Sequence, residues 1–400
     1  MKDIFAKYAP LVAEARLLLS NNRQNPFNVV IEEAISPTRA FIKGKETLLF
    51  GTNNYLGLSH SDAAKKAAIE VIKKHGVGTT GSRIANGTLS IHQELETTFA
   101  EAFGKKHAIV FSGGYLANLG VISGIADKND IILLDADSHA SIYDGARLSG
   151  AQVLRFRHNK PEDLERRLKL LKDHQGSVLI VVEGIYSMTG NMAPLKEFVR
   201  IKKEYGAALL VDEAHSFGVY GDNGLGIAEL QGVLDDVDFV VGTFSKAIGT
   251  MGGFCISDRE ELELVRVTSR PYMFTVSPSP EIIGATLANL KEIQSHPEWR
   301  ENIQRNAKQL NIGLREMGFS PNKDIAAIIG VPVGETPRAM LFWEKLLKKG
   351  VYVNLSLPPA TPDNNGLLRM SVTSSHTSEE ISQALKSIKE VKEEMEAFDI

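Results

Sequence analysis

The stretch Ala-Ala-Leu-Leu-Val-Asp-Glu-Ala-His, residues 207–215, decides the fold of this 400-residue chain. Its first five residues form an apolar run without polar alternation, and Asp212 follows directly. A strand that helices cover on both faces has this pattern, and such strands belong to mostly parallel sheets. Asp212 then stands at the carboxyl end of the strand, where parallel α/β sheets place their sites.

Four further apolar runs repeat this pattern, and helical patterns separate them. They are His107–Phe111, Ile131–Leu134, Val178–Val182 and Phe239–Val241. Polar or glycine-bearing clusters follow the runs at 112–115, 135–139, 183–187 and 242–246. The alternation predicts an α/β fold with a mostly parallel central sheet and helices on both faces. We therefore expect all five clusters to meet at one edge of that sheet.

The pattern changes toward both ends of the chain. Residues 1–45 combine a leading amphipathic helix with a stretch that contains Pro26 and Pro37. We interpret them as an arm that packs on the body or on a second subunit, with a membrane-surface helix as the alternative. After about residue 280 come helices and short alternating segments. We expect a large domain over 46–280 and a small C-terminal α+β domain over 281–400.

Composition excludes several classes of protein. Hydrophobic residues make up 43% and charged residues 24%, and the net charge is −4, so the chain should fold compactly and offers no general field for nucleic acid. Cys255 is the only cysteine, which excludes an intramolecular disulfide and a cysteine-based zinc cage. The sequence has neither a signal-peptide pattern nor a membrane-spanning apolar run. We therefore expect a cytoplasmic protein without a structural metal.

An acidic residue after an apolar strand is also typical of nucleotide hydrolases, where it holds magnesium. Those enzymes need a phosphate loop that ends in Gly-Lys-Ser or Gly-Lys-Thr. Here Gly44-Lys45 precedes Glu46, and Gly104-Lys105 precedes Lys106. The required partner motif is missing, so we set this alternative aside.

Lys246 follows the next predicted strand and lies among small and hydroxyl residues. Taken alone, such a residue is more often a surface lysine. Together with Asp212 and with Gly113-Gly114 at the start of a helix, Lys246 forms the set of residues that is typical of enzymes that use pyridoxal phosphate (PLP). In those enzymes a lysine holds the cofactor aldehyde, a carboxylate pairs with the pyridine nitrogen, and backbone N–H groups bind the phosphate.

The whole set of motifs resembles a known family, the α-oxoamine synthases, which are PLP-dependent enzymes of aspartate-aminotransferase fold. The resemblance covers about residues 25 to 395 and rests on motifs at 81–83, 137–141, 183–188, 212–216 and 243–246. The segments 78–83, 270–275 and 358–362 are most similar to the bacterial branch that acts on serine. Some members of that branch carry arginine where this chain has Leu357, so no role of that arginine can be transferred.

The resemblance implies roles for individual residues. Lys246 would hold the cofactor aldehyde as a Schiff base, Asp212 would pair with the pyridine nitrogen, and His139 would stack on the ring. His215 would hydrogen-bond the phenolic oxygen. Other cofactor contacts would come from Gly113, Gly114, Tyr115, Ser187, Thr243, Ser245 and, from a second subunit, Thr275.

The implied reaction is a decarboxylative Claisen condensation of L-serine with a long-chain acyl-CoA such as palmitoyl-CoA. The products would be ketodihydrosphingosine, coenzyme A and CO₂, so the chain would be an acyltransferase of sphingolipid synthesis. Arg369 would bind the serine carboxylate, and Asn54 would line the site from the partner chain of a homodimer.

Two alternatives remain open beside this reaction. Another activity of the same family, that of aminoketobutyrate ligase or oxononanoate synthase, is the first. A non-catalytic scaffold subunit is the second, and the presence of Lys246, His139 and Asp212 argues against it.

Other conspicuous residues have simpler explanations. Ser90 and Gln93 have capping-box spacing before a helix over Ile91–Phe103, and His92 on that helix should be structural. His158 should shape a turn with Asn159. Cys255 lies on an apolar stretch and should be a buried small hydrophobe.

Overall fold

The computed structural model describes residues 3–18, 24–358, 360–361 and 365–397. The described residues form two compact units. The larger unit contains residues 53–305 and 373–375, and the smaller contains residues up to 52 together with 306–372 and 376 onward. The predicted boundaries at 45 and 280 stay a prediction, and the contacts within the chain group 281–305 with the larger unit.

The larger unit is built on a seven-stranded sheet with the order β4-β10-β9-β8-β7-β5-β6. Its strands are β4 His107–Phe111, β5 Ile131–Asp135, β6 Gln152–Phe156, β7 Val178–Glu183, β8 Ala208–Asp212, β9 Phe239–Thr243 and β10 Gly253–Ser257. β10 runs antiparallel to both of its neighbours, and the pairs from β9 to β6 are parallel. The five predicted strands and the mostly parallel sheet are confirmed. β6 and β10 were not predicted.

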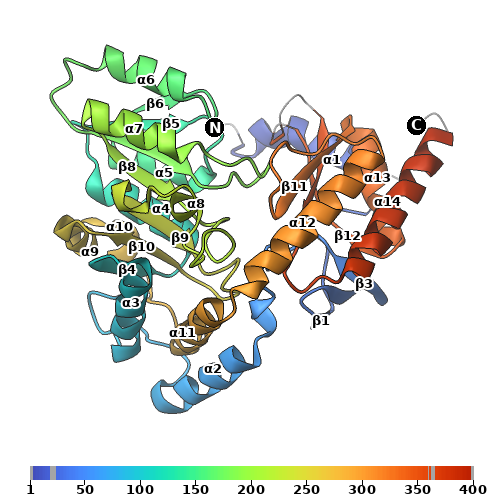
Figure 1. The fold of residues 1–400 in the computed structure, drawn as a ribbon, viewed down its shortest axis with the longest axis horizontal. Coiled ribbons are helices and arrows are strands. Elements are labelled where there is room, and N and C mark those ends of the chain that lie inside the picture. Colours follow the sequence, from blue (N-terminus) through green and yellow to red (C-terminus); the bar gives the residue numbers. More distant parts are fainter. Residues whose placement is uncertain (1–2, 19–23, 359, 362–364, 398–400) are drawn as a thin grey trace. The chain divides into compact units, whose positions relative to one another are not determined.

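Helices cover both faces of this sheet (Figure 1). Ile109, Phe111 and Cys255 point to the face that packs on α4 Gly114–Ile125 and α5 Ala140–Ser149. Phe254 points to the other face and stacks on Phe99 of α3 Ser90–Phe103 at 4.6 Å between ring centroids. The alternation of side chains along β10 thus fills two cores. Cys255 is fully buried, as predicted, and burial raises the pKa of its thiol.

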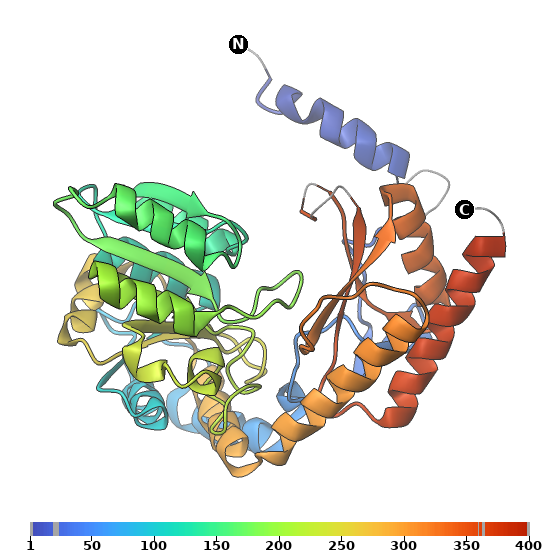
Figure 2. The same cartoon turned by 45° about the horizontal axis from the view of Figure 1, so that its top comes forward.

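The remaining helices of the larger unit are short or lie at its periphery. They are η2 Leu58–His60, α2 Asp62–His75, α6 Pro161–Leu170, α7 Leu195–Tyr205, α8 Ile227–Leu230, η3 Leu234–Asp236, η4 Glu260–Leu264, α9 Val265–Thr268, α10 Arg270–Met273 and α11 Pro280–Ser295. α6 and α7 lie side by side on one face of the sheet, as Figures 1 and 2 show.

The capping box predicted at Ser90 and Gln93 is wrong. α3 begins at Ser90, one residue before the predicted start, so Leu89 is the N-cap residue and His92 takes the third helical position. His92 Nδ1 accepts from the Leu89 N–H at 3.1 Å, and its Nε2 lies 2.9 Å from the Pro278 carbonyl. This fully buried histidine is structural, as expected, and it performs the capping that the sequence assigned to Gln93.

The smaller unit has two sheets, β1-β2-β3-β12 and β11-β14-β13. Its elements are η1 Ala6–Tyr8, α1 Ala9–Leu18, β1 Glu33–Ser36, β2 Arg39–Ile42, β3 Lys45–Leu49, β11 Ile328–Gly334, α13 Thr336–Lys348, β12 Val351–Tyr352, β13 Asn354–Ser356, β14 Gly366–Ser371 and α14 Ser378–Ala397. α12, Glu298–Glu316, has residues in both units. α13 and α14 lie side by side, and Trp343 of α13 is fully buried.

The N-terminal stretch contains the predicted leading helix as α1. Its Leu11 and Val12 are exposed, so nothing in the described part of this chain covers them. Pro359 and Pro362 of the predicted 358–362 motif lie outside the described residues. No helix within the described ranges combines the length and apolar character that crossing a bilayer requires.

Candidate active site

The carboxyl ends of the central strands enclose a pocket of about 190 Å³ in the larger unit. Three neighbouring strands contribute Glu183, Asp212 and Thr243, each the last residue of its strand. Eight predicted site residues line this pocket: Gly114, Tyr115, His139, Asp212, His215, Thr243, Ser245 and Lys246. The pocket also contains Asn118, Ser141 and Glu183, to which the sequence analysis assigned no role.

Asp212 is buried at the end of β8, and both of its carboxylate oxygens accept hydrogen bonds. Oδ1 accepts from the Ala214 N–H at 2.8 Å, and Oδ2 accepts from Asn118 Nδ2 at 2.6 Å. Two neutral donors at these distances stabilise the charged carboxylate without cancelling its charge. The pocket therefore contains a carboxylate group in a fixed orientation, which can pair with a cationic group.

His139 is the N-cap residue of α5 and lines the pocket, with part of its surface exposed. Its backbone N–H donates to Glu183 Oε1 at 2.6 Å, and its ring Nδ1 lies 2.8 Å from Ser141 Oγ. Surrounding protein desolvates the ring and lowers its pKa; Asp212 opposes this shift, and Lys246 adds to it. The imidazole is therefore neutral over most of the physiological pH range.

Glu183 is fully buried at the end of β7, in register with Asp212 on β8. Burial raises the pKa of Glu183 well above its usual value, and the neighbouring Asp212 charge raises it further. Two carboxyl groups this close do not both ionise easily, so the proton stays on Glu183. The pair thus has one charged and one neutral member.

Hydroxyl and backbone groups form a cradle at the start of α4. Thr243 Oγ1 lies 2.9 Å from Ser245 Oγ and donates to the Gly252 carbonyl at 3.0 Å. A Cβ atom on Gly114 would come within 2.6 Å of Thr243 Cβ, so only glycine lets the helix start so close to these hydroxyls. The first N–H groups of α4 and its positive dipole end suit an anion.

His215 follows the same strand as Asp212 and is buried. Its Nδ1 lies 2.7 Å from the hydroxyl of Tyr55, which is itself fully buried. This bond fixes the ring orientation of His215 in the pocket wall. Tyr55 directly follows the predicted site residue Asn54, and the sequence predicted no role for Tyr55 itself.

Five predicted site residues do not line this pocket. Gly113 is the N-cap residue of α4, and Ser187 lies beyond β7. Asn54 exchanges hydrogen bonds with Ser59, at 2.8 Å from its Nδ2. Thr275 lies with Ser112 and Pro278. Arg369 belongs to β14 of the smaller unit and is buried.

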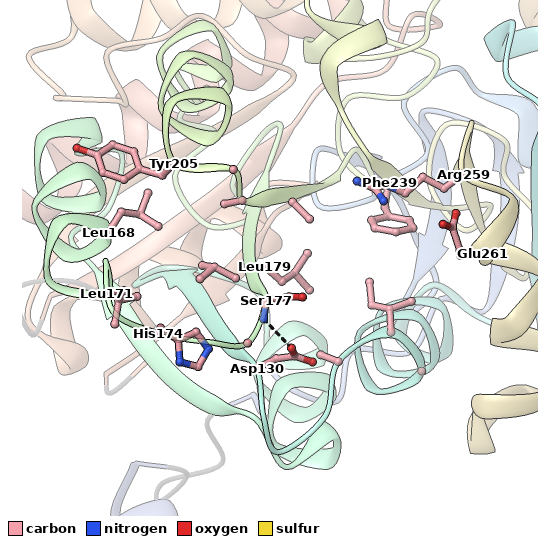
Figure 3. A pocket seen from close by; sticks show the side chains of 18 of the residues that line it. Asp130, Leu168, Leu171, His174, Ser177, Leu179, Tyr205, Phe239, Arg259 and Glu261 are labelled. Atoms are coloured by element: carbon pink, nitrogen blue, oxygen red, sulfur yellow. Dashed lines mark hydrogen bonds between the residues drawn. The ribbon is translucent and has the colours of Figure 1, made fainter.

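A larger cavity lies at the opposite edge of the same sheet. It measures about 630 Å³ and is lined by the first residues of β7, β8 and β9 together with Leu168, Tyr205 and Arg259 (Figure 3). One of its lining carboxylates has a backbone partner: Asp130 accepts from the Ser177 N–H at 3.0 Å. None of the predicted catalytic residues borders this cavity.

Comparison with known proteins agrees with the geometry of the smaller pocket. The family model "Aminotransferase class I and II" matches residues 45–388. The chain belongs to this family. The PLP-dependent fold expected from the sequence is thereby confirmed.

Individual members of the aminotransferase class I and II family are similar over most of the chain. A serine palmitoyltransferase of Caulobacter vibrioides is 52% identical, with 92% of this chain and 91% of that protein covered. An 8-amino-7-oxononanoate synthase of Lysinibacillus sphaericus is 41% identical, covering 88% and 91%. A solved serine palmitoyltransferase with a PLP internal aldimine has a TM-score of 0.95 at 44% identity, covering 98% and 99%. The predicted resemblance to the α-oxoamine synthases is confirmed.

His158, outside this pocket, does more than shape a turn. Asn159 does adopt a positive φ of 50°, as a turn residue can. The His158 ring, however, lies 2.9 Å from Asp135 through Nδ1. Burial alone would lower the pKa of His158, but the hydrogen bond and charge of Asp135 outweigh it and raise the pKa.

Proposed function

We propose that this chain is a PLP-dependent serine palmitoyltransferase, which condenses L-serine with palmitoyl-CoA. One observation carries the proposal. Lys246, Asp212 and His139 line one pocket in a chain that is 52% identical to a serine palmitoyltransferase. Since the family also includes 8-amino-7-oxononanoate synthases, the choice of substrate is what an experiment has to decide.

The donor set of the pocket fits PLP. The hydroxyls of Thr243 and Ser245 and the start of α4 at Gly113 and Gly114 would hold the phosphate, with Tyr115 beside them. Asp212 would hold a proton on the pyridine nitrogen. His139 would lie against the ring, and His215 and Ser187 would bind its edge. When bound, PLP supplies an electron sink for negative charge that develops at the amino acid Cα.

Individual residues of the chain would each perform one part of the reaction. The amine of Lys246 would remove the Cα proton of serine and return a proton after CO₂ has left. His139 would orient the Cα–H bond. Between these steps the serine Cα forms a bond to the acyl carbon, the thioester C–S bond breaks, and coenzyme A departs. Asp212 would keep its orientation throughout, because two N–H donors hold its oxygens.

The remaining roles involve Arg369, Asn54 and Thr275. Arg369 would bind the serine carboxylate through its planar guanidinium group. Asn54 and Thr275 would serve the site of a second subunit in a homodimer. The larger unit exposes apolar side chains that a subunit interface would cover: Val77, Ile84, Met251, Phe274 and Val276.

Product identification tests the proposed substrate pair. The purified protein is offered serine, alanine and glycine, each with palmitoyl-, pimeloyl- and acetyl-CoA, and the products are identified by mass spectrometry. Serine with palmitoyl-CoA should give the largest kcat/KM, because burial at about 0.8 kcal/mol per methylene favours long chains steeply. A larger value for alanine with pimeloyl-CoA, or for glycine with acetyl-CoA, would overturn the substrate but leave the family intact.

Mixed dimers test the shared site. Lys246→Ala and Asn54→Ala chains, each inactive alone, are allowed to exchange subunits. One of the two sites in a mixed dimer should then be intact and active. No recovery despite proven subunit exchange would contradict the homodimer with shared sites. A cytoplasmic location also belongs to the proposal and fits the single, buried Cys255; cell fractionation tests it.

A further inference from the structure

Four polar side chains form a continuous line of hydrogen bonds through the pocket. Asp212 Oδ2 lies 2.6 Å from Asn118 Nδ2, and the same nitrogen lies 3.1 Å from Ser141 Oγ. Ser141 Oγ in turn lies 2.8 Å from His139 Nδ1. Asn118 and Ser141 are almost fully buried. The line therefore connects Asp212, at the end of β8, with His139, at the start of α5.

Donor and acceptor chemistry fixes the direction of these bonds. A carboxylate only accepts, so the amide group of Asn118 must point its nitrogen toward Asp212. The second N–H of that amide then donates to Ser141 Oγ. The amide oxygen of Asn118 has no hydrogen-bond partner among the described residues, so the orientation is set by Asp212 and Ser141 alone.

The Ser141 hydroxyl donates the next hydrogen bond of the line, to His139. Since Ser141 Oγ accepts from Asn118, its own hydrogen is available for His139 Nδ1. The backbone N–H of Ser141 also donates to Nδ1, at 3.2 Å. Two donors aimed at one ring nitrogen require an unprotonated Nδ1, because a hydrogen there would face both of them. The proton of the neutral ring must then be on Nε2.

We propose that Asn118 and Ser141 are positioning residues, which lock His139 as the Nε2–H tautomer and tie that tautomer to the carboxylate of Asp212. The proposal rests on the proposed function in one respect, namely that His139 and Asp212 serve the same bound PLP. A second hydrogen bond often sets which nitrogen of a histidine carries the proton. Here the second hydrogen bond comes from the hydroxyl of Ser141, which Asn118 and, through it, Asp212 orient.

Other charged or titratable groups near His139 agree with this assignment. Lys246 follows β9 and Glu183 ends β7. Tyr115, the second residue of α4, has its ring edge-on to the imidazole at 6.3 Å between centroids. Desolvation and Lys246 both disfavour a cationic imidazole, and only Asp212 favours one. A neutral ring with a fixed proton can donate a hydrogen bond through Nε2, but it cannot accept a proton there.

Nitrogen NMR of the ring tests the tautomer directly. The PLP-loaded protein is labelled with ¹⁵N-histidine, and the signals of His139 are those missing from His139→Gln. At neutral pH, Nε2 should be protonated and Nδ1 should not. A protonated Nδ1, or a cationic ring, would overturn the proposal. Because no substrate is present, this result does not depend on which acyl-CoA the enzyme uses.

Two variants test the two ends of the hydrogen-bonded line separately. Ser141→Ala should shift the Nδ1 signal toward that of an unbonded nitrogen and lower kcat about ten-fold, with PLP affinity unchanged, since Asp212 keeps its Asn118 partner. Asn118→Leu, similar in size, should lower both kcat and PLP affinity about ten- to a hundred-fold, since Asp212 loses a donor.

Ser123→Ala is the matched control. It removes a partly buried hydroxyl from α4. Among the described residues, this hydroxyl donates to the Leu119 carbonyl at 2.6 Å, away from the line. Its nitrogen spectrum and kinetics should match the wild type. The proposal fails if Ser141→Ala and Ser123→Ala have the same ring spectrum and the same kcat. Should Ser141→Ala not fold, the wild-type spectrum alone still decides the tautomer.

Discussion

The two edges of the seven-stranded sheet differ in what they contain. At the amino edge, the first residues of β7, β8 and β9 border a cavity of about 630 Å³ (Figure 3). At the carboxyl edge, the last residues of the same strands border a pocket of about 190 Å³. In the larger cavity, the lining carboxylate of Asp130 accepts from backbone N–H groups of loop residues, Asp127 and Ser177.

The smaller pocket instead has polar groups that are bonded to one another across strands and helices. Glu183, Asp212 and His139 come from three separate elements, and burial shifts the pKa of two of them. Catalytic groups need this mutual arrangement more than they need volume, because desolvated neighbours tune one another's protonation. By this criterion the smaller pocket, and not the larger cavity, is the candidate active site.

The largest expected effect comes from Lys246→Ala at the carboxyl edge. Turnover should fall by at least about 1,000-fold, because the lysine is both the cofactor attachment and the base in the proposed reaction. Product formation by mass spectrometry measures the loss. Borohydride reduction of the wild type should place the pyridoxyl group on the peptide with Lys246.

The exposed Lys203 on α7 provides the control for this change. Lys203→Ala should keep full turnover. A pyridoxyl group on any lysine other than Lys246 would contradict the assignment of the carboxyl edge as the site.

The next effect concerns stability and Glu213, which neighbours Asp212. Glu213 is fully buried and accepts from the Ile227 and Ala228 N–H groups, and burial raises its pKa from 4.5 to about 7. The native state therefore holds a proton that the unfolded chain releases, so the free energy of unfolding should fall as pH rises from 4.5 to about 7. The loss should be about 3 kcal/mol.

Urea unfolding across this pH window measures the Glu213 contribution. Glu213→Gln cannot titrate and must turn an amide N–H toward a backbone donor, so it should be less stable throughout but should lose this share of the pH dependence. Equal slopes for wild type and variant would show that Glu213 does not hold the proton.

A third change separates charge from hydrogen bonding at Glu183. Because its carboxyl group is protonated, Glu183→Gln should retain activity within about fivefold, while Glu183→Ala should lose about ten- to a hundred-fold through the missing acceptor for the His139 N–H. The kcat of both variants, at equal PLP saturation, makes the comparison. If glutamine were as harmful as alanine, the site would require an ionised Glu183.

The smallest effect is expected at the amino edge. Arg259→Ala removes an ion pair with Asp238, at 3.1 Å, but Asp238 keeps Lys202 and the Leu209 N–H. Stability should change by at most about 1 kcal/mol because the arginine is exposed, and kcat/KM should not change. A tenfold loss of kcat/KM would mean that the amino edge takes part in the reaction.

The fold could be predicted where the sequence repeats one simple pattern. The five predicted strands are uninterrupted apolar runs, whereas β6 includes Gln152 and Arg155 and is mostly exposed at the sheet edge. β10 is fully buried, and its apolar run of three residues is as long as the predicted run Phe239–Val241, so run length does not explain why it was missed. Its place in the sheet depends on pairing with β4, far away in sequence, which no local pattern reveals.

The candidate site likewise has residues that the sequence could predict and residues that it could not. The residue types of Lys246 and Asp212 themselves indicate their chemistry. Asp212 ends β8, and Lys246 stands three residues after the end of β9. Asn118 and Ser141 act through other residues, so their importance appears only when α4, α5 and β8 are placed together. One signal was available for Asn118: it stands four residues after Gly114, one turn along the same helix face.

The pairing of β3 with β12 has a consequence for how the chain is made. Leu48 and Leu49 lie in parallel register with Val351 and Tyr352, and Asn354 donates to the Gly51 carbonyl across 303 positions of sequence. During synthesis, β3 leaves the ribosome long before its partner strand exists. For most of translation the edge of the β1-β2-β3 sheet must stay unpaired, which makes it a target for chaperones and for aggregation.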